Sequence, residues 1–571
     1  MAATFIAYLP AMRGEFIWDD DAYVTQNRNL RTPQGLVDSW MRLDANPQYY
    51  PLVFSTFWIE YRLWGLSPTG YHVVNVLLHI AASLLLWQLL RLLGVPGACL
   101  VGALFAIHPV HVESVAWITE RKNVLSTLLY LASAWCLLVK TLGVERDQGQ
   151  EGRWWTAAAR QAWYLLALLL FVGALLSKTV TSSLPAAVLV VLWWKQGKIR
   201  TRQIVSLVPF FVIGIGMGLL TAWLEQKHVG ATGEEWNLSL VERSLVAGRA
   251  LWFYVAKLIW PVGLSFNYER WTIRSEVWWQ HLYPLCAVGV VASLWAFRRR
   301  IGRGPLAAVL FFSGTLFPAL GFLNVYPFRY SYVADHFQYL ASVGLLTLAG
   351  GSTVWWLSRR GRIIQRAGMI AAAVVLVLLG VQTWRRGHAY ADSVTLWEDT
   401  LTKNPTSYLA NYNLGCERMR LKQVKSAMSH FRAAIAAKPG VARHHYSLGK
   451  ALVVTAQIDE AIEQFRKSIE YDPNYLLGHN NLGVVLEHYK KDYPAAAERF
   501  RDVIRIDPNV PLGHVNLGRT LLEMGQIPEA IAELQHALRL DQTDDYVRQL
   551  LEHTEAEARK RAATEPAARG S

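Results

Sequence analysis

The sequence predicts an all-α protein in which a polytopic bundle of membrane helices is followed by a solenoid of helical repeats. Hydrophobic residues form 53% of the 571 residues, and apolar runs of nearly bilayer length recur up to about residue 384. Beyond residue 404 these runs end and a repeat begins. We expect a membrane domain over residues 1–384, a linker helix over 385–404, four repeats over 405–555 and a charged disordered tail over 556–571.

About eleven segments are candidate membrane spans, because about 20 apolar helical residues cross the hydrocarbon core. The first candidate is shorter than this length and is interpreted as part of a span. A further apolar stretch, residues 245–260, is interpreted as re-entrant or interfacial. The candidates are residues 2–12, 73–93, 97–117, 123–142, 161–177, 179–194, 204–224, 281–297, 305–325, 337–357 and 366–384.

Basic clusters in the loops predict the orientation of this bundle. The clusters at residues 195–202, 298–303 and 359–366 all fall on one side, which the positive-inside rule makes cytoplasmic. The loops 13–70 and 225–280, the region 108–123, the turn 324–336 and the repeats then face the other side. Arg385 and Arg386 also fall there, against the rule.

The net charge of +14 does not indicate a nucleic-acid binder. Most of the basic excess lies before residue 403 in short loops, where lysine and arginine orient the chain and contact lipid headgroups. The four cysteines form no CxxC pair and no Cys/His spacing typical of zinc. We therefore expect an integral membrane protein with no nucleic-acid partner, no metal and no cofactor.

The C-terminal part repeats with the period and residue order of tetratricopeptide repeats (TPRs). A Leu-Gly pair marks the first helix of each unit, and its glycine is Gly415, Gly449, Gly483 or Gly518. A small residue and then a Phe or Leu follow at fixed distances, as in Ala427 and Phe431. The pattern predicts four stacked helix pairs.

Stacked TPR pairs form a concave surface suited to an extended peptide. Asparagines on the predicted first helices can hydrogen-bond a peptide backbone without reading its side chains. The candidate acceptor-binding residues are Asn411, Asn480, Asn481 and Asn516. The alternative is that the array only supports the membrane domain.

Three adjacent aspartates, Asp19, Asp20 and Asp21, follow the first apolar segment. Like charges this close repel, so at least one carboxyl should have a raised pKa or a cationic partner. A carboxylate held beside the hydrocarbon suits a general base. The alternative is a solvated loop start that caps the next helix.

Other polar residues lie inside or at the ends of apolar segments, where polarity is costly. His72, Asn75 and His79 share one helical face, which indicates either hydrogen bonds between helices or the lining of a pathway. The candidates for substrate binding are His72, His108, His111, Glu113, Asp335 and His336.

Basic residues gather at helix ends on the non-cytoplasmic side. Arg121, Lys122 and Lys178 together indicate a bound anion such as phosphate. Arg329, in the turn before residue 337, is added to this set. The alternative for each residue is ordinary snorkelling to the interface.

The motifs FIWDDDAYV, YHVVNVLLH, HPVHVESVAWITERKN and SKTVTSSLP, with the repeats after them, resemble the transmembrane and TPR-containing O-mannosyltransferases of the GT-C superfamily. WDDDAY and ADHFQYL are similar to bacterial members. The resemblance implies that Asp19 and Asp20 match the catalytic acidic pair, with Asp19 the preferred base for inverting transfer. It also implies a polyprenyl-phosphate sugar donor, with mannose the expected sugar, whose phosphate the basic residues stabilise.

The same resemblance implies protein acceptors recruited by the TPR array, in the bacterial inner membrane with site and repeats on the periplasmic side. Two alternatives stay open. One is transfer to a lipid or glycan acceptor, and the other is a non-enzymatic membrane-anchored scaffold.

Overall fold

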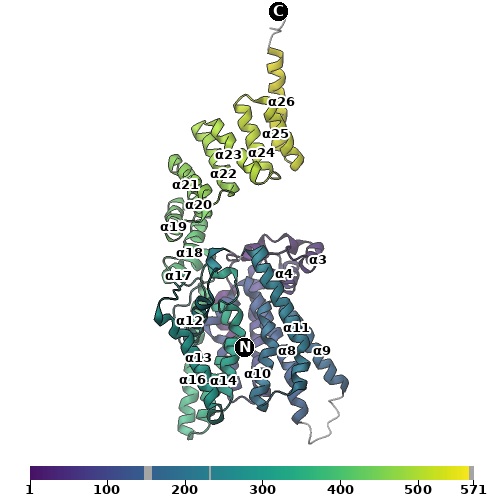
Figure 1. The fold of residues 1–571 in the computed structure, drawn as a ribbon, viewed down its shortest axis with the longest axis vertical. Helices are drawn as coiled ribbons and strands as arrows, with labels where there is room; N and C mark the ends of the chain where they lie inside the picture. Colours follow the sequence, from purple (N-terminus) through teal and green to yellow (C-terminus); the bar gives the residue numbers. More distant parts are fainter. Residues whose placement is uncertain (147–156, 231–232, 565–571) are drawn as a thin grey trace, which may run out of the picture. The chain divides into compact units, whose positions relative to one another are not determined.

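The computed structural model describes residues 1–146, 157–230 and 233–564 (Figure 1). Within these ranges the regular structure is helical, as the sequence predicts. The chain divides into two compact units, residues 1–405 and 406–571.

In the described part of the first unit, five helices are long and apolar enough to cross a membrane. A sixth span is possible if α6 (Ala98–Ile107) and the helical turns at Pro109–Ala116, which are bent by 51°, form one broken span. The predicted count of about eleven is therefore not confirmed. The five helices are α5 (Pro68–Leu92), α8 (Arg121–Arg146), α11 (Thr201–Leu224), α13 (Leu282–Ile301) and α16 (Arg362–His388).

The remaining apolar helices of this unit are not among the candidate spans. They include α12 (Leu240–Ile259), whose 20 residues cover the stretch interpreted as re-entrant or interfacial. The others are α1 (Ala2–Ala7), α2 (Leu9–Met12), α9 (Ala157–Leu175), α10 (Leu184–Gln196), α14 (Gly304–Leu316) and α15 (Ser342–Leu357).

The segment between α6 and α8 is bent and irregular, and it carries much of the candidate site. Pro109 cannot continue α6 because it lacks an N–H. Short turns follow, namely η3 (Pro109–His111), α7 (Val112–Ala116) and η4 (Ile118–Glu120). Each turn changes the chain direction, so polar residues close in sequence face different neighbours.

The first loop contains α3 (Pro33–Met41) and α4 (Pro51–Trp64). Tyr23 and Phe54 stack with ring centroids 5.3 Å apart, and they join Phe57 and Tyr71 in a buried cluster. This cluster packs the loop onto α5 and α8. Other short turns are Asp21–Thr25, Arg28–Arg31, Thr179–Ser183, Glu225–Val229, Glu234–Trp236, Trp278–His281, Phe317–Ala319, Tyr326–Arg329 and Asp335–Gln338.

The expected linker belongs to the first unit. Helix α16 continues to His388, and α17 (Ser393–Lys403) follows after a short turn. The buried Arg386 pairs with Asp399 and donates to the Tyr390 hydroxyl at 3.2 Å. The predicted exception to the positive-inside rule at Arg386 is therefore a buried, paired arginine, whereas the rule concerns charges in loops.

The second unit consists of helix pairs. Residues 556–564, expected to be disordered, continue α26 (Asp545–Thr564), so that expectation is wrong for them, and residues 565–571 lie outside the described ranges. The preceding helices are α18 (Tyr408–Arg420), α19 (Val424–Ala437), α20 (Ala442–Val454), α21 (Ile458–Tyr471), α22 (Leu476–Val485) with the turn Leu486–Lys490, α23 (Tyr493–Ile506), α24 (Pro511–Glu523) and α25 (Ile527–Leu540).

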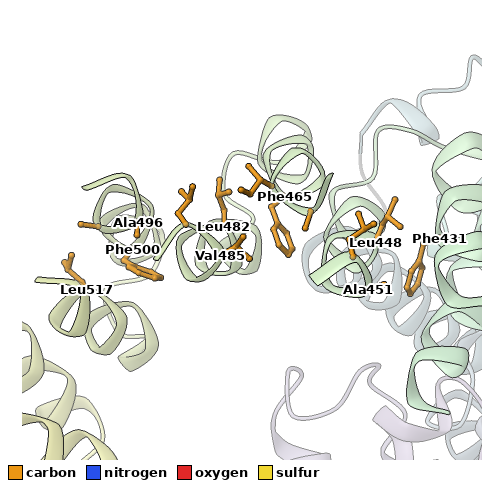
Figure 2. Packing of buried hydrophobic residues seen from close by; sticks show 14 of the residues in the cluster. Phe431, Leu448, Ala451, Phe465, Leu482, Val485, Ala496, Phe500 and Leu517 are labelled. Carbon is orange, nitrogen blue, oxygen red and sulfur yellow. The ribbon is translucent and has the colours of Figure 1, made fainter. Parts of the chain in front are cut away.

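Each Leu-Gly pair has a packing reason. A Cβ built on Gly415 would lie 2.6 Å from the ring of Phe431, and one on Gly449 would lie 2.7 Å from Phe465. Only glycine lets the aromatic ring of the second helix press against the first helix. Figure 2 shows these buried rings among the leucines and alanines of the array.

Candidate active site

The turn that carries the aspartates is held by a strained tryptophan. Trp18 has a φ of 44°, in the left-handed region that non-glycine residues rarely adopt. Its indole stacks on Trp117 with centroids 5.5 Å apart and meets the edges of Phe266 and Trp397. These ring contacts offset the backbone strain and fix the direction in which the next two residues leave the turn.

Asp20 is fully buried and its carboxylate is occupied. One oxygen accepts the Ile17 N–H at 2.9 Å, and the other accepts the N–H and hydroxyl of Thr119 at 2.8 and 2.6 Å. Burial raises the pKa of Asp20 to about 7, although the three hydrogen bonds oppose this shift. Asp20 therefore positions the first loop against the bent segment and is not open to an acceptor.

Asp19 has the opposite surroundings. Its side chain is partly exposed, and no hydrogen bond or ion pair to its carboxylate is found within the described ranges. Burial raises the pKa of Asp19 to about 6, while the charge of Lys122 lowers it and that of Glu120 raises it. Asp19 is thus the carboxylate of the pair that is open to an acceptor hydroxyl, and its pKa suits a general base.

Two lysines share one buried glutamate beside Asp19. Lys122 Nζ lies 2.9 Å from Glu120 Oε1, and Lys178 Nζ lies 3.3 Å from Glu120 Oε2. Lys178 also donates to Asn123 Oδ1 at 2.7 Å. Burial lowers the pKa of Lys178 to about 8, although Glu120 opposes this shift. The structure therefore brings two of the predicted phosphate ligands together.

A second polar pair adjoins this cluster. His336 Nδ1 lies 2.7 Å from Glu113 Oε1, and the Asn123 amide donates to the His336 carbonyl at 3.0 Å. Tyr268 donates to Asp335 at 2.9 Å, and burial raises the pKa of Asp335 to about 7, with the charge of Glu113 adding to the shift. The structure thus places Glu113, Asp335 and His336 in a buried layer next to the lysines.

Arg121 is not part of this cluster, so the structure does not bring it to the predicted phosphate site. Its side chain is fully buried, pairs with Glu60 and binds Asn75 Oδ1. It also donates to the Tyr71 carbonyl at 2.9 Å and the Thr56 hydroxyl at 3.2 Å. Arg121 ties α4 and α5 to the start of α8.

The candidate histidines of the spans mostly join helices. His111 contacts the Phe105 carbonyl at 2.8 Å and the Ser342 hydroxyl at 2.9 Å, so both ring nitrogens are occupied. His108 contacts the Leu258 carbonyl at 3.1 Å. His79 contacts the Tyr339 hydroxyl at 2.6 Å, and His72 is buried against the backbone of Gly14. Substrate binding by His72, His108 and His111 is therefore not supported.

Arg329 lies in a different group. Its Nε is 3.6 Å from Glu235 Oε2, and it donates to the Tyr326 hydroxyl at 2.9 Å. No contact with either site lysine is found within the described ranges. The structure therefore does not bring Arg329 to the predicted phosphate site.

The four asparagines of the array have mixed exposure. Asn411, Asn480 and Asn516 are buried, and Asn516 donates to Asn480 at 2.8 Å. Asn481 is partly exposed beside the Tyr446 hydroxyl, 3.3 Å away. Asn481 alone among the four offers an accessible amide, so acceptor contact by the others would need rearrangement.

Sequence reasoning missed the residues that organise the site. Glu120 joins the lysines, Thr119 holds Asp20, and Trp117 supports Trp18. Thr119 and Glu120 lie between two predicted spans, and Trp117 ends the first of these spans. All three belong to the motif HPVHVESVAWITERKN, which was the available signal. In the described part of the chain, no group of three or more His, Cys, Asp or Glu is arranged to hold a metal ion.

Comparisons with known proteins agree with this organisation. Family models described as tetratricopeptide repeat match residues 446–511 and 489–553. The protein O-mannosyl-transferase F38B6.6 of Caenorhabditis elegans is 24% identical over 73% of this chain and 59% of its own length. The protein O-mannosyl-transferase TMTC4 of Homo sapiens is 27% identical over 72% of this chain and 62% of its own length. Among solved structures, MamA matches 26% of this chain and 81% of its own, with 19% identity and a TM-score of 0.25, too low to carry an argument.

The chain therefore spans about 60% of the length of these two relatives. Their names, the TPR matches and the apolar helices fit the family of TMTC-type protein O-mannosyl-transferases, as the sequence motifs predict. The apolar helices and these relatives also indicate an integral membrane protein.

Proposed function

We propose that the protein is a membrane glycosyltransferase that transfers a sugar, with mannose the expected one, from a polyprenyl-phosphate donor to hydroxyl groups of protein acceptors. The observation that carries the proposal is the partly open Asp19 carboxylate beside the two lysines that share Glu120. The names of the relatives support the class of reaction.

The chemistry follows from these groups. Asp19 takes the proton of the acceptor hydroxyl while the hydroxyl oxygen attacks the anomeric carbon of the sugar. The bond between that carbon and the phosphate oxygen breaks, and the lipid phosphate leaves with the electron pair. Attack opposite the leaving group inverts the anomeric centre. Lys122 and Lys178 stabilise the charge that develops on the phosphate.

An apolar cavity supports a lipid-linked donor. It has a volume of about 590 Å³ and lies among α5, α8, α10, α14 and α15. Its lining includes Tyr130, about two turns along α8 from Lys122, and Leu184, at the start of α10 after the turn that follows Lys178. The lining continues to Arg303, in the basic cluster at the other end of the bundle. A polyprenyl tail in this cavity would therefore run along α8 and α10 away from the lysines, with its phosphate at the end that holds Lys122.

We assign acceptor recruitment to the TPR unit, with site and array on the periplasmic side of a bacterial inner membrane. The basic clusters at residues 195–202, 298–303 and 359–366 support this orientation. The helix pairs of the second unit supply the surface for an extended acceptor.

The full-length protein in nanodiscs, incubated with a panel of polyprenyl-phosphate sugars and a Ser/Thr-rich acceptor protein, tests the proposal. We expect consumption of one lipid-linked sugar, with the label appearing on the acceptor protein. Label on lipid or glycan alone would overturn the assignment of protein acceptors. No consumption of any donor would overturn the enzymatic function.

A further inference from the structure

A small polar pocket lies between the first loop and the end of α11. Its volume is about 200 Å³, and its lining includes Asn46, Gln48, Tyr50 and Glu225. The described residues that line it include no lysine or arginine, so the pocket does not suit a phosphate group. Its polar groups also distinguish it from the apolar cavity that a lipid tail would fill.

A chain of contacts joins this pocket to Lys122. The Lys122 ammonium lies 5.4 Å from the centroid of the Tyr23 ring. The Tyr23 hydroxyl donates to Gln48 Oε1 at 2.7 Å, and Gln48 Nε2 donates to Glu225 Oε1 at 3.0 Å. The other carboxylate oxygen of Glu225 accepts the backbone N–H of Tyr326 at 3.1 Å. The pocket therefore adjoins the phosphate site, and its carboxylate is held from two sides.

Two groups of the pocket keep hydrogen-bonding capacity for a ligand. Glu225 is only 7% exposed and has no ion-pair partner within the described ranges. A carboxylate has about four acceptor positions, of which Gln48 and Tyr326 use two. The Tyr50 hydroxyl has no hydrogen-bond partner among the described residues, and it lies within the electrostatic influence of Glu225 and Lys122. A ligand with several O–H donors would satisfy both groups.

We propose that this pocket is the subsite for the sugar ring of the lipid-linked donor, in which Glu225 and the Tyr50 hydroxyl bind the hydroxyl groups of the sugar. The sugar is joined to the phosphate through a single oxygen, so a phosphate at Lys122 places the ring next to this lysine, where the pocket lies. The hydroxyl groups of a neutral sugar supply the O–H donors, and the C–H face of its ring suits an aromatic side chain such as Tyr49 in the same lining. This inference rests on the proposed function and names the residues that recognise the transferred sugar.

Steady-state kinetics of the full-length protein in nanodiscs test the inference. The donors are the lipid-linked sugar that the wild type consumes and its monodeoxy analogues, each of which lacks one hydroxyl. Glu225→Gln should lower kcat/KM for the natural donor by about tenfold, because a neutral amide accepts hydrogen bonds more weakly than a carboxylate. At least one analogue should be about tenfold or more poorer for the wild type, and less than about threefold poorer for Glu225→Gln. A purely structural role of Glu225 would instead slow the use of every donor equally.

Glu235→Gln is the matched control, because Glu235 pairs with Arg329 outside the pocket lining, and it should keep the wild-type values. Tyr50→Phe keeps the ring and should lower kcat/KM by about threefold to tenfold. If Glu225→Gln does not fold, the same comparison of donors with Tyr50→Phe decides. An unchanged kcat/KM, an equal loss with every donor, or an effect confined to the KM of the acceptor protein overturns the inference and leaves the proposed function standing. Failure of the wild type to consume any donor overturns the proposed function itself.

Discussion

Asp19 and Asp20 are neighbours in the chain, yet the fold gives them different environments. Asp20 is buried under three hydrogen bonds from Ile17 and Thr119. Asp19 lies beside Lys122, and its carboxylate has no hydrogen-bond or ion-pair partner among the described residues. The sequence predicts the acidic pair but not this division, because Thr119 lies 99 residues away from Asp20 in the chain.

The pH dependence of transfer should reflect this arrangement. Asp19 must be deprotonated to act as a base and Lys178 must be charged to stabilise the phosphate. We therefore expect kcat/KM to rise through about pH 6, the pKa of Asp19, and to fall above about pH 8, the pKa of Lys178. The measurement is the initial rate of transfer between pH 5 and 9.

A single variant checks which group determines the acid limb of the pH profile of kcat/KM. Lys122 lowers the pKa of Asp19, so Lys122→Met should move the acid limb to higher pH as well as slow transfer. An acid limb that stays in place in this variant would mean that a group other than Asp19 controls it.

The adjacent residues Arg121 and Lys122 have side chains in different surroundings. Successive helical side chains point about 100° apart, so Arg121 faces the interior and Lys122 faces the site. The sequence predicts two equivalent cations, because it does not show that Glu60 lies against Arg121.

Replacing Arg121 should therefore lower the stability of the first unit, whereas Arg121 has no direct part in the transfer reaction. Arg121→Ala leaves the buried Glu60 unpaired, which is expected to destabilise the first unit by about 3–5 kcal/mol. Lys122→Met should slow transfer with a far smaller loss of thermal stability. Thermal unfolding of both variants in the same detergent makes the comparison, and equal losses of stability would contradict the distinction.

At the scale of elements, the repeat pattern was the most predictable part of the chain. The glycine and aromatic positions follow from packing within one unit, and that packing repeats at a fixed period. The bent passage from Pro109 to Glu120 was the least predictable, because its apolar composition also fits a continuous span. The predicted number of spans is likewise not confirmed, because several apolar helices are shorter than the length that membrane spans usually have.

Gly449→Ala should loosen one repeat. The new methyl would lie 2.7 Å from the Phe465 ring, an overlap expected to cost about 1–3 kcal/mol. Hydrogen exchange in the full-length protein should show faster exchange in α20 and α21. Gly440→Ala is the control, because its nearest contact is 3.9 Å away, at Tyr471. Similar exchange in both variants would contradict the packing account.

At the scale of the whole molecule, the chain combines a membrane unit that holds the candidate site and a TPR unit that is compact in itself. This division predicts that the chemical transfer step and the recruitment of large acceptors can be lost separately. A chain ending at residue 405 should still transfer sugar to a short hydroxyl-bearing peptide at high concentration. It should lose most transfer to a large unfolded acceptor protein. Equal transfer rates of the full-length chain and the chain ending at residue 405 on that acceptor protein would contradict a recruitment role for the TPR unit.

The account depends on Asp19 as the base, and replacement of single aspartates in this cluster tests it most directly. The measurement is the initial rate of sugar transfer by Asp19→Asn and Asp21→Asn in nanodiscs, with the donor that the wild type consumes. Asp21 is exposed and accepts a hydrogen bond from Thr25, so it is a matched control two residues away. We predict a loss of about 10²–10⁴-fold for Asp19→Asn and a rate near wild type for Asp21→Asn. A folded Asp19→Asn protein with a wild-type rate would contradict the account.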